Sequence, residues 1–197
     1  AAKMKARAAI WTVVDFESTG SVRGHADEPW QVGMVEMKEG RVTGRHHETY
    51  LRVAAGRPFN PYAPGRHAEI RHVLAAAPPM AELWPVWRPW LEGRPLAAHN
   101  VGTERKFLMR AAPMHELGPW IDTLQLARRV RPDLEGHSLA DVCEALGLVA
   151  RAREFCPGRE WHDALFDAFA SALVLEASLA LPGWEDVSVE ALAQGLR

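Results

Sequence analysis

Residues 11–20 read Trp-Thr-Val-Val-Asp-Phe-Glu-Ser-Thr-Gly, an apolar run that ends in two carboxylates and a turn. The adjacent valines favour a strand, and side chains alternate between the two faces of a strand, so Asp15 and Glu17 should share one face. Two like charges on one face of a buried strand repel each other unless a cation or a proton offsets them. The pair is therefore either a solvated strand end or part of a metal site.

The composition is typical of a globular protein. The chain has 197 residues, of which 48% are hydrophobic and 24% are charged, and its net charge is −2. These values fit one domain with a sizeable core, and they exclude a polycation, so any nucleic acid should bind in a local groove. Cys143 and Cys156 are too few for a disulfide framework. No apolar run has the length of a membrane span and no signal peptide is recognisable, so we expect a cytoplasmic protein without a membrane partner.

Turn residues and apolar periodicity divide the chain into strands and helices. We expect strands at 8–15, 30–37, 42–53, 95–98 and 120–121, helices at 68–77, 80–91, 101–112, 123–131, 139–146, 161–181 and 184–196, and a charged loop at 149–160. Three antiparallel strands followed by shorter parallel strands and helices predict an α/β fold, a mixed sheet flanked by helices. The expected division is a flexible tail at 1–7, a domain at 8–181 and a C-terminal helical appendage at 182–197 packed on that domain.

Two further carboxylates lie on apolar helix faces. Glu104 is in the first turn of the helix expected at 101–112, on the side that carries Phe107 and Leu108. Asp167 is the single charge within residues 164–175, in a helix that is apolar nearly all round and therefore buried. An isolated buried carboxylate is costly unless it is paired or binds a metal. Asp167 therefore indicates either a structural ion pair or a metal site.

Asp15, Glu17, Glu104 and Asp167 together offer only oxygen ligands. Such ligands select hard cations, Mg²⁺ or Mn²⁺, and two such ions about 4 Å apart catalyse phosphoryl transfer. His162, near the start of the Asp167 helix, is a candidate general base. A straight helix would turn its side chain roughly 140° away from that of Asp167, so His162 would have to reach the carboxylates from the helix end or the preceding loop.

Three segments resemble the motifs of the DEDDh family of 3′–5′ exonucleases, the DnaQ-like group that includes the proofreading subunit of bacterial DNA polymerase III. Residues 14–20 (VDFESTG) are similar to its Asp-x-Glu-Thr-Thr-Gly motif, and residues 98–108 (AHNVGTERKFL) to its Ala-His-Asn-x-x-Phe-Asp-x-x-Phe-Leu motif. Residues 162–168 (HDALFDA) are similar to its His-x-Ala-x-x-Asp-Ala motif. The resemblance implies an RNase H-like fold and makes the expected domain at 8–181 an exonuclease domain.

The resemblance also implies a role for each matched residue. Asp15, Glu17, Asp167 and, at the position of the fourth acidic residue, Glu104 would bind two divalent cations, Mg²⁺ or Mn²⁺. His162 would deprotonate the attacking water. The positions that match substrate contacts of the family are Ser18, Thr19, Gly20, His99 and Asn100. Two residues depart from the second motif, because Glu104 replaces an aspartate and Thr103 replaces an aromatic residue.

The expected function is a two-metal-ion 3′–5′ exonuclease that removes nucleoside monophosphates from single-stranded or frayed DNA or RNA. The departure at Glu104 motivates an alternative, a catalytically weak subunit that binds nucleic-acid ends or a polymerase. An RNase H-like endonuclease is a third possibility, and the motif at residues 162–168 argues against it. The chain has no Gln-Leu-Phe clamp-binding pattern, so we expect a stand-alone or DNA repair nuclease rather than a dedicated replicative subunit. A polymerase or repair partner stays open.

Overall fold

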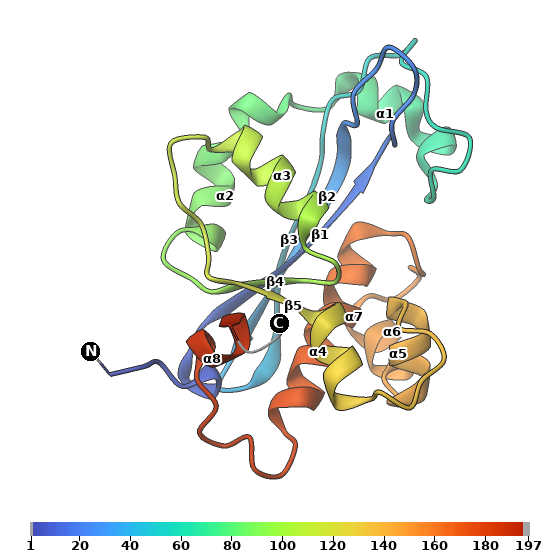
Figure 1. Ribbon diagram of the computed structural model, residues 1–197. Coiled ribbons are helices and arrows are strands. Elements are labelled where there is room, and N and C mark those ends of the chain that lie inside the picture. The colour runs from blue at the N-terminus through green and yellow to red at the C-terminus, as the bar shows by residue number, and fades with distance from the viewer. Residues whose placement is uncertain (1, 195–197) are drawn as a thin grey trace.

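The computed structural model describes residues 2–194 as one five-stranded sheet with helices on both faces (Figure 1). The strands are β1 (Trp11–Ser18), β2 (Pro29–Lys38), β3 (Arg41–Tyr50), β4 (Leu96–Ala98) and β5 (Trp120–Asp122). Their order is β3-β2-β1-β4-β5, with β2 antiparallel to β1 and β3, and with β4 parallel to both β1 and β5. The mixed sheet predicted from the sequence is confirmed.

Helices cover each face of the sheet with a separate apolar core. They are α1 (Arg71–Ala76), α2 (Trp84–Leu91), α3 (Gly102–Ala111), α4 (Thr123–Val130), α5 (Leu139–Ala145), α6 (Val149–Phe155), α7 (Ala164–Leu179) and α8 (Val189–Gln194). Val14 and Phe16 pack with α2 and α3, whereas Val13 packs on the other face with α4 to α8. Because side chains alternate along β1, Asp15 and Glu17 face α7. Between residues 2 and 194, the helices are all too short or too polar to cross a membrane.

The first strand lies three residues later than expected. β1 begins at Trp11 and continues to Ser18, because its antiparallel pairing with β2 extends as far as Pro29. Residues 6–8, expected in the strand or the tail, form a short 3₁₀ turn. Asp15 therefore pairs with Gly33 and Glu17 with Gln31, and a bulge follows between Glu17 and Ser18. Both carboxylates lie inside the ladder, where the strand backbone holds them in place.

The prediction of a charged loop at 149–160 is wrong for its first half, because residues Val149–Phe155 form α6. Its charged residues lie on the outer side of the helix, where Arg151 forms an ion pair with Glu176 of α7. The opposite side of α6 is apolar. That face buries Ala152 and stacks the ring of Phe155 on Phe169 of α7, with 5.2 Å between ring centroids. Because charged residues separate the apolar ones along this segment, its sequence did not indicate an amphipathic helix.

Caps and prolines move other helix boundaries. The helix expected from 161 begins at Ala164, because the Asp163 carboxylate accepts a hydrogen bond from the amide of Phe166 at 3.0 Å and caps it. The helix expected at 80–91 divides into a 3₁₀ turn and α2, which has Pro85 in its first turn. Asp122 caps α4 by accepting the amide of Leu124 at 2.9 Å, and Ser138 caps α5 by accepting the amide of Asp141 at 3.2 Å.

The two ends of the described chain lie against each other. The amide of Ala6 donates to the carbonyl of Val187 at 2.8 Å, and the amide of Val189 donates to the carbonyl of Met4 at 2.9 Å. These bonds involve residues that we expected in a flexible tail. The last helix, expected at 184–196, spans Val189–Gln194 among the described residues, and positions 195 and 196 lie outside them.

Gly33 of β2 sets how closely α7 approaches the sheet. A Cβ atom at this position would lie 2.5 Å from the carbonyl oxygen of Ala164 and 2.6 Å from the Cα of Leu165. Both contacts are to backbone, which cannot move without shifting the helix. Because Gly33 pairs with Asp15, the absent side chain lets the start of α7 lie next to the acidic face of β1.

We expect Gly33→Ala to destabilise the fold by about 1–3 kcal/mol, the usual cost of overpacking a close contact. Thermal unfolding measures this change, and a domain of this size loses about 2–4 °C of Tm per kcal/mol. Gly56→Ala is the matched control, because a Cβ at Gly56 would meet nothing within 4 Å. Equal melting temperatures for the two variants would contradict the close approach of α7.

Candidate active site

Asp15 and Glu17 form the β1 side of the site. The Glu17 side chain is buried, with 6% of its surface exposed. The Oδ2 atom of Asp15 is also buried and has no hydrogen-bond partner. A buried carboxylate oxygen without a donor is costly, so this atom requires a compensating charge or a proton.

Asp167 brings a third carboxylate from the first turn of α7. It is 8% exposed, and its two oxygens accept the backbone amide of His162 at 3.2 and 3.3 Å. The cap at Asp163 explains this contact, because it starts the helix after His162 rather than before it. The angular separation expected from a continuous helix therefore does not apply, and His162 approaches from the preceding turn.

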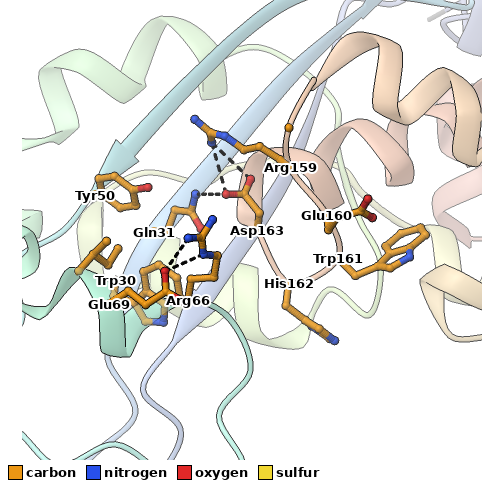
Figure 2. A pocket seen from close by; sticks show the side chains of 12 residues that line it. Trp30, Gln31, Tyr50, Arg66, Glu69, Arg159, Glu160, Trp161, His162 and Asp163 are labelled. Carbon is orange, nitrogen blue, oxygen red and sulfur yellow. Dashed lines mark hydrogen bonds and ion pairs between the residues drawn. The ribbon is translucent and has the colours of Figure 1, made fainter.

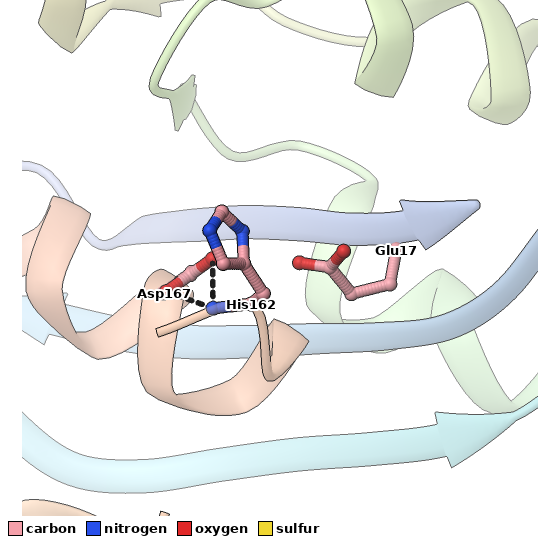
Figure 3. A group of neighbouring side chains, drawn as sticks. All are labelled: Glu17, His162 and Asp167. Atoms are coloured by element: carbon pink, nitrogen blue, oxygen red, sulfur yellow. Dashed lines mark hydrogen bonds between the residues drawn. The ribbon is translucent and has the colours of Figure 1, made fainter. Parts of the chain in front are cut away.

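His162 lies beside two of the carboxylates. Ligand atoms of Glu17, His162 and Asp167 all lie within 4.8 Å of one another, and Figure 3 shows the His162 ring between the two carboxylates. The His162 side chain is exposed, whereas Glu17 and Asp167 are buried. Its backbone has a φ of 67°, which is uncommon for a residue other than glycine and is typical of functional sites.

Glu104 enters from α3 at the other side of β1. Its carboxylate is 4% exposed, and Oε1 accepts the amide of Phe16 at 3.4 Å, a long hydrogen bond. The second oxygen, Oε2, is buried without a partner. Glu104 and Asp15 are not in the group of Glu17, His162 and Asp167, so the structure brings three of the five expected residues into one tight cluster and places two next to it.

Burial disfavours the charged forms of all four carboxylates, and neighbouring charges add to this at Asp15 and Glu17. Burial raises the pKa of Asp15 well above its ordinary value, and the charges of Asp167, Glu17 and Glu104 raise it further. Burial, together with Asp167, raises the pKa of Glu17 to about 9. Burial also raises the pKa of Asp167 and that of Glu104, each to about 7. At neutral pH the cluster therefore holds protons that a bound cation would displace.

The donor set fits divalent cations. Asp15 Oδ2 and Glu104 Oε2 are buried and unpartnered, and hard oxygen ligands suit Mg²⁺ or Mn²⁺. None of the ion pairs between residues 2 and 194 uses any of the four carboxylates, so the protein itself supplies no neutralising arginine or lysine there. A candidate metal site at this position accounts for both observations.

The residues after β1 form a fixed turn at the edge of the site. The Thr19 side chain is fully buried, and its hydroxyl accepts the Glu28 amide at 3.0 Å and the Arg57 guanidinium at 3.2 Å. Gly20 has a φ of 69°, and a Cβ there would lie 2.7 Å from Asn60. Thr19 therefore holds the turn in place between Ser18, the last residue of β1, and Gly20, and contact of these three residues with a substrate stays a prediction.

His99 and Asn100 differ in what they offer. Both ring nitrogens of His99 are occupied, Nε2 by the carbonyl of His137 at 2.9 Å and Nδ1 by the Thr123 hydroxyl at 2.8 Å. Since a carbonyl only accepts, Nε2 carries the proton, and burial lowers the pKa of His99. Neither nitrogen is free for a substrate, so this residue anchors the turn after β4. Asn100 is exposed, with a φ of 68°.

A cavity of about 370 Å³ lies beside the His162 turn, and His162 is part of its lining (Figure 2). Its lining includes Gln31, Arg159 and Asp163, which were not among the expected site residues. One signal was available for Gln31, a polar residue that is 1% exposed within an otherwise apolar strand. The pairing of Arg159 with Glu48 of β3 spans 111 residues, and no sequence pattern indicates it.

Comparisons with known proteins match this geometry. Residues 12–175 match the RNase T exonuclease family. A DNA polymerase III subunit epsilon-like protein of Rhodobacter capsulatus is 31% identical over 166 residues, which cover 82% of this chain and 22% of that protein. The DNA polymerase III subunit epsilon of Rickettsia prowazekii is 27% identical over 179 residues, which cover 87% of this chain and 73% of that protein.

Solved structures of Escherichia coli exonuclease I share the fold. A complex with a dT13 oligonucleotide has a TM-score of 0.63 and 15% identity over 87% of this chain and 41% of that chain. A zinc-bound complex with single-stranded DNA has a TM-score of 0.67 and 16% identity over 91% of this chain and 42% of that chain. The chain thus spans less than half of exonuclease I and about a fifth of the R. capsulatus protein. The family match, which extends from β1 into α7, shows that this chain belongs to the RNase T exonuclease family and has the RNase H-like fold of the DnaQ-like group.

Proposed function

We propose that this chain is a metal-dependent 3′–5′ exonuclease that releases nucleoside monophosphates from single-stranded or frayed 3′ ends. The observation that carries the proposal is the cluster of Glu17, His162 and Asp167, with unpartnered oxygens of Asp15 and Glu104 beside it. Exonuclease I, which has the same fold, is known in complexes with oligonucleotides, and this supports a single-stranded substrate. A polymerase or repair partner and a cytoplasmic location stay predictions.

In this proposal the four carboxylates hold two divalent ions. Bound ions would neutralise charge on the phosphate and lower the pKa of water. Glu17 and Asp167 are the ligands nearest to the exposed His162, while Asp15 of β1 and Glu104 of α3 complete the set. The exposed ring of His162 accepts the proton of the attacking water, and the turn at residues 18–20 positions the terminal nucleotide with its backbone.

The direct test is digestion of a 3′-labelled single strand with Mg²⁺ or Mn²⁺. Release of labelled mononucleotides from the first time points is expected, and DNA and RNA strands of one sequence would give the sugar preference. Failure to release mononucleotides with either ion would refute the proposal. A circular single strand should stay intact, because an exonuclease needs an end.

We expect His162→Ala to lower kcat about 10²–10⁴-fold, the usual contribution of one general base. Binding of Mn²⁺, measured by calorimetry, should not change, because the proposal gives His162 no ligand role. His72→Ala is the control, since His72 is exposed on α1. A loss of Mn²⁺ affinity in His162→Ala would instead make the histidine a metal ligand.

We expect Asp15→Asn to abolish activity and yet to stabilise the metal-free protein at high pH. A carboxyl whose pKa is raised by folding binds its proton more tightly in the folded state, so stability falls as pH rises from its ordinary value to the raised one. For this cluster the window runs from about 4 to about 9. Removing one charge should therefore raise Tm in EDTA at pH 8.5 more than at pH 5. Glu144→Gln, an exposed change of equal charge, is the control.

An equal gain in Tm at both pH values would show that repulsion within the cluster is not the cause. The same would follow if Glu144→Gln matched the gain of Asp15→Asn.

Glu104→Asp distinguishes the exonuclease from a catalytically weak binding subunit. The shorter side chain loses the hydrogen bond to the Phe16 amide, so we expect a lower rate, by roughly fivefold for a bond worth about 1 kcal/mol. Steady-state kinetics with a single-stranded substrate measures the change. A large gain in rate would show that glutamate at this position makes the native site a poor catalyst, and would favour the catalytically weak binding subunit.

A further inference from the structure

The backbone of His162 needs support from outside its own turn. Its φ of 67° lies in the left-handed region, which residues other than glycine rarely adopt unless neighbouring contacts fix it. One contact is the bond of its amide to Asp167. That bond restrains the amide of His162. The peptide group between His162 and Asp163 needs a separate contact to restrain it.

The residues that follow His162 are clamped to β2 by one side chain. Gln31 accepts the amide of Ala164 through Oε1 at 2.9 Å and donates through Nε2 to Asp163 at 3.1 Å. The same amide nitrogen donates to Glu48 of β3 at 2.9 Å. Gln31 is 1% exposed, so these bonds are shielded from water. The amide group of Gln31 thus joins the start of α7 to two strands.

Arg159 fixes the other end of the same turn. Its guanidinium donates to Glu48 through both terminal nitrogens, with the Nη2–Oε1 distance at 3.0 Å, and lies 3.4 Å from both oxygens of Asp163 (Figure 2). The planar fork of arginine can hold two carboxylates at once, which a lysine cannot do with the same geometry. Arg159 also neutralises part of the charge that Asp163 adds next to the acidic cluster.

We infer that Gln31 and Arg159 are positioning residues that act through Asp163 to hold His162 in its left-handed conformation, with its ring beside Glu17 and Asp167. The inference rests on the proposed role of His162 as the base. The hydrogen bonds of the two side chains go to Glu48, Asp163 and Ala164, and not to a carboxylate of the cluster, although Gln31 pairs with Glu17 across β1 and β2. Their effect on the reaction therefore passes through the His162 turn.

A double-mutant cycle in the full chain tests this. Arg159→Ala should lower kcat by up to about 10²-fold, the cost of misplacing a reacting group by about 1 Å, with KM and Mn²⁺ affinity unchanged. In a His162→Ala background, Arg159→Ala should cause no further loss, because the group that it positions is already absent. Arg159→Lys should recover part of the rate, since it keeps the charge and one hydrogen bond.

Arg153→Ala is the matched control. Arg153 pairs with Glu160 of the same turn at 3.1 Å and contacts neither Asp163 nor Gln31. It should leave kcat unchanged. A second variant, Gln31→Ala, removes the bonds to Ala164, Asp163 and Glu48 without adding a charge beside Glu17, and it should also show a loss that disappears in the His162→Ala background.

The outcomes separate this inference from the proposed function. The positioning role is refuted if His162→Ala lowers the rate but Arg159→Ala does not, or if the double variant shows the product of the two single losses. In both cases the proposed role of His162 as general base is unaffected. An equal loss in Arg153→Ala would likewise overturn the inference, because any disturbance of the turn would then suffice. If His162→Ala keeps the wild-type rate, the proposed base fails and the inference with it.

Discussion

Four carboxyl groups gathered around β1, two from the strand itself and one each from the first turns of α3 and α7, are the constraint on which the rest of the structure depends. Gly33 allows the helix to approach the strand, so that Asp167 comes within reach of Asp15 and Glu17. Burial raises the pKa of all four carboxyls, and the neighbouring charges raise those of Asp15 and Glu17 further. None of the ion pairs within residues 2–194 brings a lysine or arginine to the four. Such an arrangement costs stability, and the cost is typical of sites built to bind a cation.

The cluster also determines where the candidate base lies. The Asp167 carboxylate accepts the amide of His162, so one side chain is at once a candidate ligand and the anchor of the neighbouring residue. Movement of the turn would disturb both. The clamp of Gln31 and Arg159 connects this anchor to β2 and β3, and so ties the site to the antiparallel half of the sheet.

The sequence was sufficient for the sheet and for most of the acidic cluster, because strand alternation and an apolar helix are local patterns. Alternation placed Asp15 and Glu17 on one face, and the almost uninterrupted apolar sequence around Asp167 predicted its burial. Other features depend on contacts distant in sequence. The start of α7 after His162 follows from a cap, Asp163, that Gln31 supports from 132 residues away. The hydrogen bonds of both His99 ring nitrogens and the bond of Glu104 to Phe16 depend on tertiary packing as well.

The central claim, that the carboxylate cluster is a divalent metal site, is tested most directly by titrating the metal-free protein with Mn²⁺ in a calorimeter at pH 7. Repeating the titration in buffers of different ionisation enthalpy counts the protons released. We predict two bound ions, the number that the proposed function requires. We also predict the release of at least one proton, because the fold raises the pKa of Glu17 to about 9 and those of Asp167 and Glu104 to about 7. No saturable binding, or binding without proton release, would contradict the account.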